Sequence, residues 1–160
     1  MIIHDKISAL LPLELPLSIR SFVSNGDKNR IDIRYFFDPK NKHFYAKVIF
    51  GDLAQGPPDH AHGGAIASII DEVMGGCAWS NKLYAMTANL DITYLKAIKL
   101  NEEVFVEAWI ESIDNKKMKV NAIIQKQNGD MLVKAKGLFI RQSVEKFKAM
   151  GFIPDELFQE

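Results

Sequence analysis

The fold of this chain is decided by residues 63–82, which read GGAIASIIDEVMGGCAWSNK. Small and apolar side chains fall on nearly every side of this stretch, and a helix that is apolar all round is a buried helix. Asp71 and Glu72 interrupt the apolar run. Gly75 and Gly76 each cost about 1 kcal/mol relative to alanine inside a helix. We therefore expect close packing or a bend at these two glycines.

Strand-like segments flank this helix on both sides. The pattern predicts strands over residues 31–37, 43–50, 84–95, 103–113, 118–127 and 131–141. Apolar residues alternate with polar ones in the last three, which is the two-residue period of a strand, and Asn128-Gly129 is a strong hairpin signal. A curved antiparallel sheet with hairpin connections can cover a single buried helix. We predict an α+β domain with two strands, the central helix, and then four strands in a meander.

The chain is predicted to form one domain over residues 1–160. Its composition, 48% apolar and 25% charged, is that of an ordinary globular protein, and two full domains would be cramped in this length. Residues 1–30 are expected to be irregular, because they contain Pro12, Pro16 and a turn-forming cluster. Residues 144–160 are expected to form a short amphipathic helix that is broken at Pro154.

The bulk composition excludes several classes of partner. Twenty basic residues balance twenty acidic ones, so there is no electrostatic reason to expect nucleic acid as the main partner. A single cysteine, Cys77, rules out an intramolecular disulfide and a multi-cysteine metal cluster. No run approaches the roughly 18 apolar residues of a membrane span, and the amino terminus does not read as a secretory signal. We expect no membrane partner and, by default, a cytoplasmic location.

The motif that carries chemistry lies at the start of the predicted helix. Residues 56–64 read GPPDHAHGG, and Asp71 follows His62 by nine positions. Together with TANLDITYLK at 87–96 and KGLF at 136–139, this constellation resembles the hotdog-fold thioesterases of the phenylacetate-pathway and THEM type, over about residues 43–141. The resemblance implies a curved antiparallel sheet around a long central helix. It also implies hydrolysis of an acyl-coenzyme A to a free acid and coenzyme A, without a metal or redox cofactor.

Elementary chemistry suggests a role for each half of the motif. Gly63 and Gly64 open the helix, where the first N–H groups lack intrahelical partners and the helix dipole is positive. A thioester carbonyl there would be polarised and its oxyanion stabilised; a plain glycine turn into a helix is the alternative. Asp71 could activate water or attack the thioester directly, or it could be a hydrogen-bonded structural or dimer-contact aspartate. Glu72 points about 100° away around the helix.

Four further residues complete the candidate site. Thr87 aligns with a serine or threonine that helps to hold the attacking water in the resembled enzymes, although threonine is also favoured in any strand. His62 could orient the glycine loop or bond the substrate carbonyl. Some relatives carry an amide side chain where this chain has Gly56, and His60 is the candidate for that role. Lys96 is a candidate for contact with the phosphates of coenzyme A.

A metal site is the weaker interpretation of the same loop. Asp59, His60 and His62 lie close together in the sequence, and a His-x-His spacing can serve zinc on a strand. Here the spacing falls in a loop with no obvious further ligand. We therefore expect no metal.

The length of the helix predicts an assembly. A helix of nine residues, from 63 to 71, is about 13.5 Å long, so one substrate carbonyl cannot contact both Gly63 and Asp71 of the same chain. If both act on one thioester, each comes from a different subunit across a two-fold interface, as in the resembled family. We expect a homodimer, extended to a dimer of dimers. The alternative function is a non-catalytic acyl-coenzyme A sensor; a hotdog hydratase would need an aspartate–histidine pair that the sequence lacks.

Overall fold

The computed structural model describes residues 2–14 and 21–151. In this part of the chain six strands form one antiparallel sheet, in the order β1-β2-β4-β5-β6-β3. The strands are β1 (Ile31–Asp38), β2 (His43–Phe50), β3 (Ala85–Tyr94), β4 (Glu103–Asp114), β5 (Lys117–Gln125) and β6 (Met131–Arg141). The helices are α1 (Ile3–Ile7), the 3-10 turn η1 (Asp52–Ala54), α2 (Gly63–Ser80) and α3 (Val144–Ala149).

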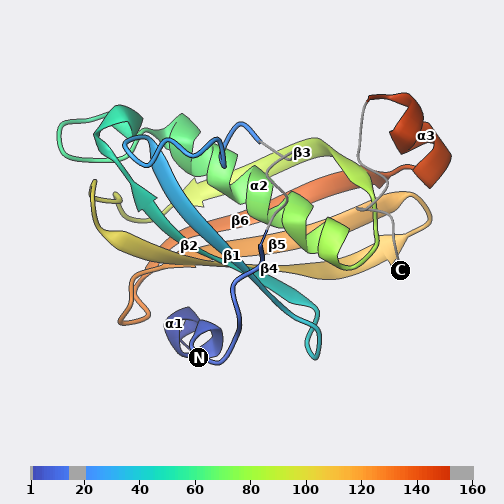
Figure 1. Ribbon diagram of the computed structural model, residues 1–160, viewed down its shortest axis with the longest axis horizontal. Helices are drawn as coiled ribbons and strands as arrows, with labels where there is room; N and C mark the ends of the chain where they lie inside the picture. The colour runs from blue at the N-terminus through green and yellow to red at the C-terminus, as the bar shows by residue number, and fades with distance from the viewer. Residues whose placement is uncertain (1, 15–20, 152–160) are drawn as a thin grey trace.

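The long helix α2 lies along one face of the curved sheet (Figure 1). Seven of its apolar side chains are almost completely removed from solvent, and they meet inward-facing residues of the strands. The helical members of this core are Ile66, Ile69, Ile70, Val73, Met74, Cys77 and Ala78. Sheet residues contact the helix from β2 through β6, which is why a helix without a polar face is stable here. The predicted α+β arrangement around a central buried helix is confirmed.

The pairing of β3 corrects the predicted four-strand meander. Strands β4, β5 and β6 do form a meander, but β3 pairs with β6 at one edge of the sheet and β4 pairs with β2. The connection between β3 and β4 crosses beside the start of α2, where the Ala61 N–H donates to the Ile98 carbonyl. Alternation of apolar residues identifies a strand but does not specify its neighbour, so this crossover could not be read from the pattern.

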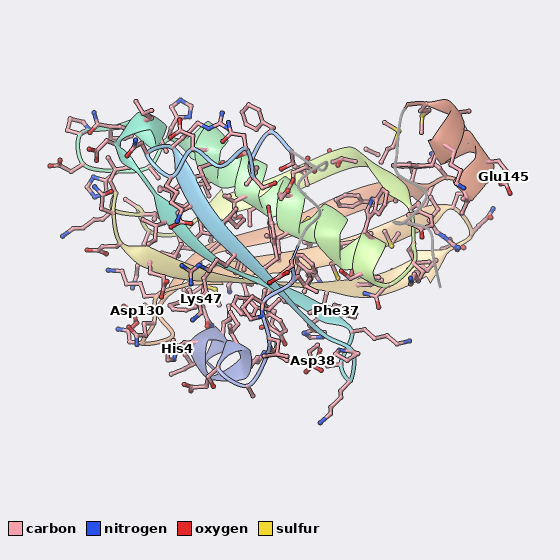
Figure 2. The ribbon with its side chains drawn as sticks, viewed as in Figure 1. His4, Phe37, Asp38, Lys47, Asp130 and Glu145 are labelled. Carbon is pink, nitrogen blue, oxygen red and sulfur yellow. The ribbon has the colours of Figure 1, made fainter. Side chains whose placement is uncertain are left out.

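A short helix replaces part of the predicted irregular N-terminal segment. α1 lies on the sheet face opposite α2 (Figure 1), and Ile3 and Ile7 are buried there with Phe36, Tyr45 and Phe105. His4 of α1 meets the Phe105 ring edge-on, and the Lys47 ammonium lies over the same ring. Figure 2 labels His4 and Lys47. Five residues are too few to show a helical period, which is why the sequence did not predict this helix.

Glu107 anchors α1 to the outer face of the sheet. Its carboxylate is 3% exposed and both its oxygens accept hydrogen bonds of 2.7 Å from the Lys6 ammonium. One oxygen also lies 2.7 Å from Nδ1 of His43. A buried carboxylate is tolerated only when it is paired and hydrogen-bonded, and α1 supplies that partner.

The C-terminal helix begins where the sequence predicts it. α3 starts at Val144 behind Ser143, whose hydroxyl accepts a hydrogen bond from the Lys146 N–H. The helix ends at Ala149, and the break predicted at Pro154 lies outside the described residues. No helix in the described ranges is long and apolar enough to cross a membrane.

The two adjacent glycines of α2 have different environments. A Cβ atom built on Gly76 would lie 2.7 Å from two carbons of the buried Phe44 ring of β2, so this ring would have to shift to admit even a methyl group. A Cβ built on Gly75 would meet nothing within 4 Å. Close packing therefore accounts for Gly76 alone.

Replacing each of these glycines by alanine should change stability in opposite directions. Gly75→Ala should raise the free energy of unfolding by about 1 kcal/mol, because alanine is the better helix former. Gly76→Ala should lower it by about 1–3 kcal/mol, because the added methyl group overpacks the contact with Phe44. Urea unfolding of both variants measures the difference, and equal shifts of the same sign would contradict the packing described for Gly76.

Candidate active site

Asp71 and Thr87 lie in direct contact. The Thr87 hydroxyl of β3 donates a hydrogen bond of 2.6 Å to Oδ1 of Asp71 in the middle of α2. Asp71 is half-buried, whereas Thr87 is exposed, so the pair lies at the surface of this protomer. A carboxylate whose Oδ1 is held in this way keeps Oδ2 for proton transfer or for attack on a carbonyl carbon. The structure thus joins two residues that the sequence had linked only through a family resemblance.

A β-bulge directs Thr87 toward the helix. Thr87 is opposite Phe139 of β6 and Asn89 is opposite Leu138, so Ala88 is an extra residue in β3. Phe139 points into the core, and its partner Thr87 therefore points to the same face. Bulges commonly re-aim side chains in this way beside functional sites. Nothing in the alternation of residues 84–95 indicated the extra residue.

His62 forms the N-terminal cap of α2. Its backbone is extended, with φ −64° and ψ 138°, and its Nδ1 accepts a hydrogen bond of 2.8 Å from the Gly64 N–H. The Gly64 N–H therefore has a partner within the chain, and the substrate contact expected for Gly64 remains a prediction. Since Nδ1 is an acceptor, the ring proton is assigned to Nε2. The exposed His62 ring thus offers an N–H donor at the start of the helix.

Gly63 keeps a free backbone donor. Among the residues that the structure describes, its N–H has no hydrogen-bond partner, while its carbonyl accepts a bond of 2.9 Å from the Tyr94 hydroxyl. A Cβ on Gly63 would lie 3.8 Å from the Tyr94 ring, an ordinary contact, and the residue is not in the left-handed region. Nothing described within the protomer requires glycine here. Close approach of a ligand to the first N–H of the helix would require it.

His60 and Lys96 have other partners in this chain. Nδ1 of His60 lies 2.9 Å from the Pro58 carbonyl, and the His60 carbonyl accepts from the Gly56 N–H, so the residue stabilises the loop before α2. The Lys96 ammonium lies 3.7 Å from Asp130, a residue of the β5–β6 connection that is labelled in Figure 2. The substrate contacts expected for both residues remain predictions.

Glu72 has a structural role that separates it from Asp71. Its Oε1 accepts hydrogen bonds of 2.8 Å from the Tyr35 hydroxyl and from the Ser21 hydroxyl. Burial, and then the neighbouring Glu72 carboxylate, raise the pKa of Tyr35, which keeps this hydroxyl protonated as a donor. Glu72 thus ties the segment before β1 to the helix, and Asp71 is the acid left at the surface.

Cys77 is a buried thiol and is not a candidate nucleophile. Cys77 is fully buried, and burial raises the pKa of its thiol to about 11, so it is protonated and is not a nucleophile. In the described ranges, no group of three histidine, cysteine, aspartate or glutamate residues is arranged to hold a metal ion.

A shallow hollow of about 460 Å³ lies on the other side of the sheet from this site. Its lining includes Trp109, Asn121, Ile123, Lys134 and Lys136. These residues alternate along their strands with the core residues that face α2, so they point away from the helix. The hollow is therefore distinct from Asp71 and Gly63.

Comparison with known proteins shows similarity to thioesterases. Residues 59–133 match the thioesterase superfamily model. The acyl-coenzyme A thioesterase THEM4 of Mus musculus is 45% identical over 93 residues, which are 58% of this chain and 40% of that protein. THEM4 of Xenopus laevis is 30% identical over 125 residues, covering 76% of this chain and 56% of its own length. The chain thus spans about half the length of the curated relatives it matches.

Solved structures share the fold at lower identity. The smu.793 protein of Streptococcus mutans bound to acetyl CoA superimposes with a TM-score of 0.67 at 20% identity, covering 81% of this chain and 98% of that one. The PaaI protein of the E. coli phenylacetic acid degradation operon gives a TM-score of 0.62 at 16% identity, covering 71% and 80%. The predicted hotdog architecture is confirmed by these matches.

Two substitutions of His62 can distinguish its role as the helix cap from a role in contacting a ligand. His62→Asn keeps a good capping acceptor, whereas His62→Ala removes it and should lower the free energy of unfolding by about 1 kcal/mol. Both variants lose the Nε2–H donor, so we expect thioester hydrolysis to fall about 100-fold in each. Steady-state turnover and urea unfolding are the measurements. Full turnover by His62→Asn would restrict the residue to its cap.

Proposed function

Since residues 59–133 belong to the thioesterase superfamily, we propose that this chain hydrolyses acyl-coenzyme A to a free acid and coenzyme A. The observation that carries the proposal is that one helix, α2, holds two groups that thioester hydrolysis needs, a free N–H donor and a carboxylate. The free Gly63 N–H at the start of α2 can receive an oxyanion, and the Asp71 carboxylate, oriented by Thr87, can supply the attack. The similar THEM4 proteins are named acyl-coenzyme A thioesterases, which supports the choice of substrate.

The geometry supports a mechanism in which Asp71 acts as a general base and activates a water molecule. As a general base, Oδ2 of Asp71 takes a proton from water while the resulting hydroxide bonds to the thioester carbon. The Thr87 hydroxyl, which donates its proton to Oδ1, can accept a hydrogen bond from that water. The oxyanion is stabilised by the Gly63 N–H, the dipole of α2 and the Nε2–H of His62. Its collapse breaks the carbon–sulfur bond, and the thiolate takes the proton from Asp71.

Direct attack by Asp71 is the other route that this geometry allows. Oδ2 would bond to the thioester carbon and expel the thiolate, which leaves an acyl–aspartate anhydride that water then hydrolyses. Single-turnover hydrolysis in oxygen-18 water tests for this route, because hydrolysis of the anhydride at its aspartyl carbon sends an aspartate oxygen into the first acid released and leaves oxygen-18 in Asp71, whereas general-base attack places oxygen-18 in the acid.

A homodimer completes the proposed site. α2 is helical without interruption from Gly63 to Asp71, so the two groups are separated by more than 10 Å along its axis and cannot reach one carbonyl. β3 forms an edge of the sheet, and Met86 and Tyr94 on it are about half exposed. A long exposed edge strand is normally covered, and pairing of two β3 edges would bring a partner's α2 close. The extension to a dimer of dimers remains a prediction.

Release of free thiol from a panel of acyl-coenzyme A substrates tests the activity. The panel should include short, long and aromatic acyl groups, because the structure does not select among them. Wild-type protein should release thiol from at least one member, and Asp71→Asn should reduce kcat by about 100-fold or more, since an amide is neither base nor nucleophile. Glu72→Gln is the matched control, because its amide oxygen can still accept from Tyr35 and Ser21; it should retain turnover. Tight binding without turnover of any substrate would indicate a sensor instead.

Subunit exchange tests the shared site. Gly63→Pro removes the N–H donor at the first helical position, where proline is tolerated, and the extended His62 backbone suits a residue before proline. Asp71→Ala removes the acid. Each variant alone should keep only a small residual turnover, but an equal mixture after exchange should recover about a quarter of the wild-type turnover, because half the dimers then carry one intact site. Proven exchange without recovery would contradict the shared site.

A further inference from the structure

Tyr94 is a residue that the motif did not identify and that contacts the proposed oxyanion site. It is the last residue of β3, and its hydroxyl donates a hydrogen bond of 2.9 Å to the Gly63 carbonyl. Its ring is the nearest group to Gly63, at 3.8 Å from the position of a Cβ atom there. The contact joins residues that are 31 positions apart, so it fixes the end of the edge strand to the first residue of the helix.

The hydrogen bonds around Gly63 fix the peptide groups on both sides of it. In the Gly63–Gly64 peptide the carbonyl accepts from Tyr94 and the N–H donates to His62. In the His62–Gly63 peptide the carbonyl accepts from the Ile66 N–H at 3.1 Å. Of these four polar groups, only the Gly63 N–H has no partner among the described residues. Two consecutive glycines allow many backbone conformations, so the two side-chain bonds to the Gly63–Gly64 peptide add to the backbone bond between Ile66 and His62 in restricting the direction of the remaining donor.

The bulge in β3 makes this contact compatible with the Thr87–Asp71 contact. Thr87 and Tyr94 are seven residues apart, and side chains at an odd separation on a regular strand point to opposite faces. The extra residue Ala88 shifts the register, so Thr87 and Tyr94 both face α2. One strand thus holds the acid in the middle of the helix and the donor at its start.

We propose that Tyr94 is a positioning residue for thioester hydrolysis, which fixes the Gly63–Gly64 peptide and thereby aims the Gly63 N–H at the oxyanion. The inference rests on the proposed function. It requires the hydroxyl and not merely the ring, because the ring contact with Gly63 is an ordinary van der Waals distance. The aligned N–H stabilises the transition state, in which negative charge develops on the carbonyl oxygen. Loss of this alignment should therefore change kcat more than KM.

Tyr94→Phe tests this role, because it keeps the ring and removes the hydroxyl. We expect kcat to fall about 3–10-fold, as for loss of alignment of one donor, while KM changes less than twofold and the unfolding midpoint is unchanged. The Gly64 amide proton should also exchange faster with solvent, as measured by NMR. Tyr35→Phe is the matched control, since it removes another hydroxyl bonded to α2, through Glu72, and should leave kcat and Gly64 exchange unchanged.

A second variant guards against a purely structural effect. In the Gly63→Pro background the donor is already absent, so adding Tyr94→Phe should cause no further loss of the residual turnover. An undiminished loss there, or wild-type kcat in Tyr94→Phe, would overturn the role of Tyr94 while leaving the proposed activity intact. Failure of the wild-type protein to release thiol from any acyl-coenzyme A would overturn both.

Discussion

The helix α2 carries almost no polar side chains, and it can be stable in water only if a sheet encloses it. Its buried residues, from Ile66 to Ala78, face strands on several sides, and burial of each large apolar side chain contributes about 1.5–3 kcal/mol. This enclosure has a chemical consequence. It fixes the position of α2 in the core. The oxyanion donor at Gly63 and the carboxylate at Asp71 are therefore both held on a single element.

The strand β3 provides what the core cannot. Edge strands have one free side and few buried residues, yet β3 supplies a hydrogen bond to Asp71 from Thr87 and one to Gly63 from Tyr94. The other edge of the sheet, β1, is contacted by the N-terminal segment, where Pro12 bridges to Phe36 and the Leu13 N–H donates to the Tyr35 carbonyl. The outer face is covered in part by α1, through Lys6 and the buried Glu107. In the described part of the chain, the N-terminal segment thus pairs with part of the β1 edge. The β3 edge, beside Asp71 and Gly63, has no neighbouring strand on its outer side.

Much of the architecture follows from local patterns, because apolar alternation and an all-apolar helix are local properties. The strands at 43–50 and 131–141 and the start of α2 at Gly63 agree with prediction at the residue level. The crossover of β3, the bulge at Ala88 and the helix α1 do not follow from such patterns, since each depends on contacts between distant segments. In the site, the spacing of His62 and Asp71 was informative. Tyr94 was not, because a tyrosine at a strand end carries no sign of the glycine that it contacts.

The extra residue at Ala88 makes the register of β3 as important as its composition. If the unchanged strand formed a regular ladder with β6 at this point, Ala88 would lie opposite Phe139 and Thr87 opposite Ile140, so Thr87 would turn to the outer face while Tyr94 stayed in place. The acid would then lose its hydroxyl neighbour although every motif residue was still present. The register of this solvent-exposed strand, and not only the identity of its residues, therefore decides whether Asp71 keeps a hydroxyl group beside it.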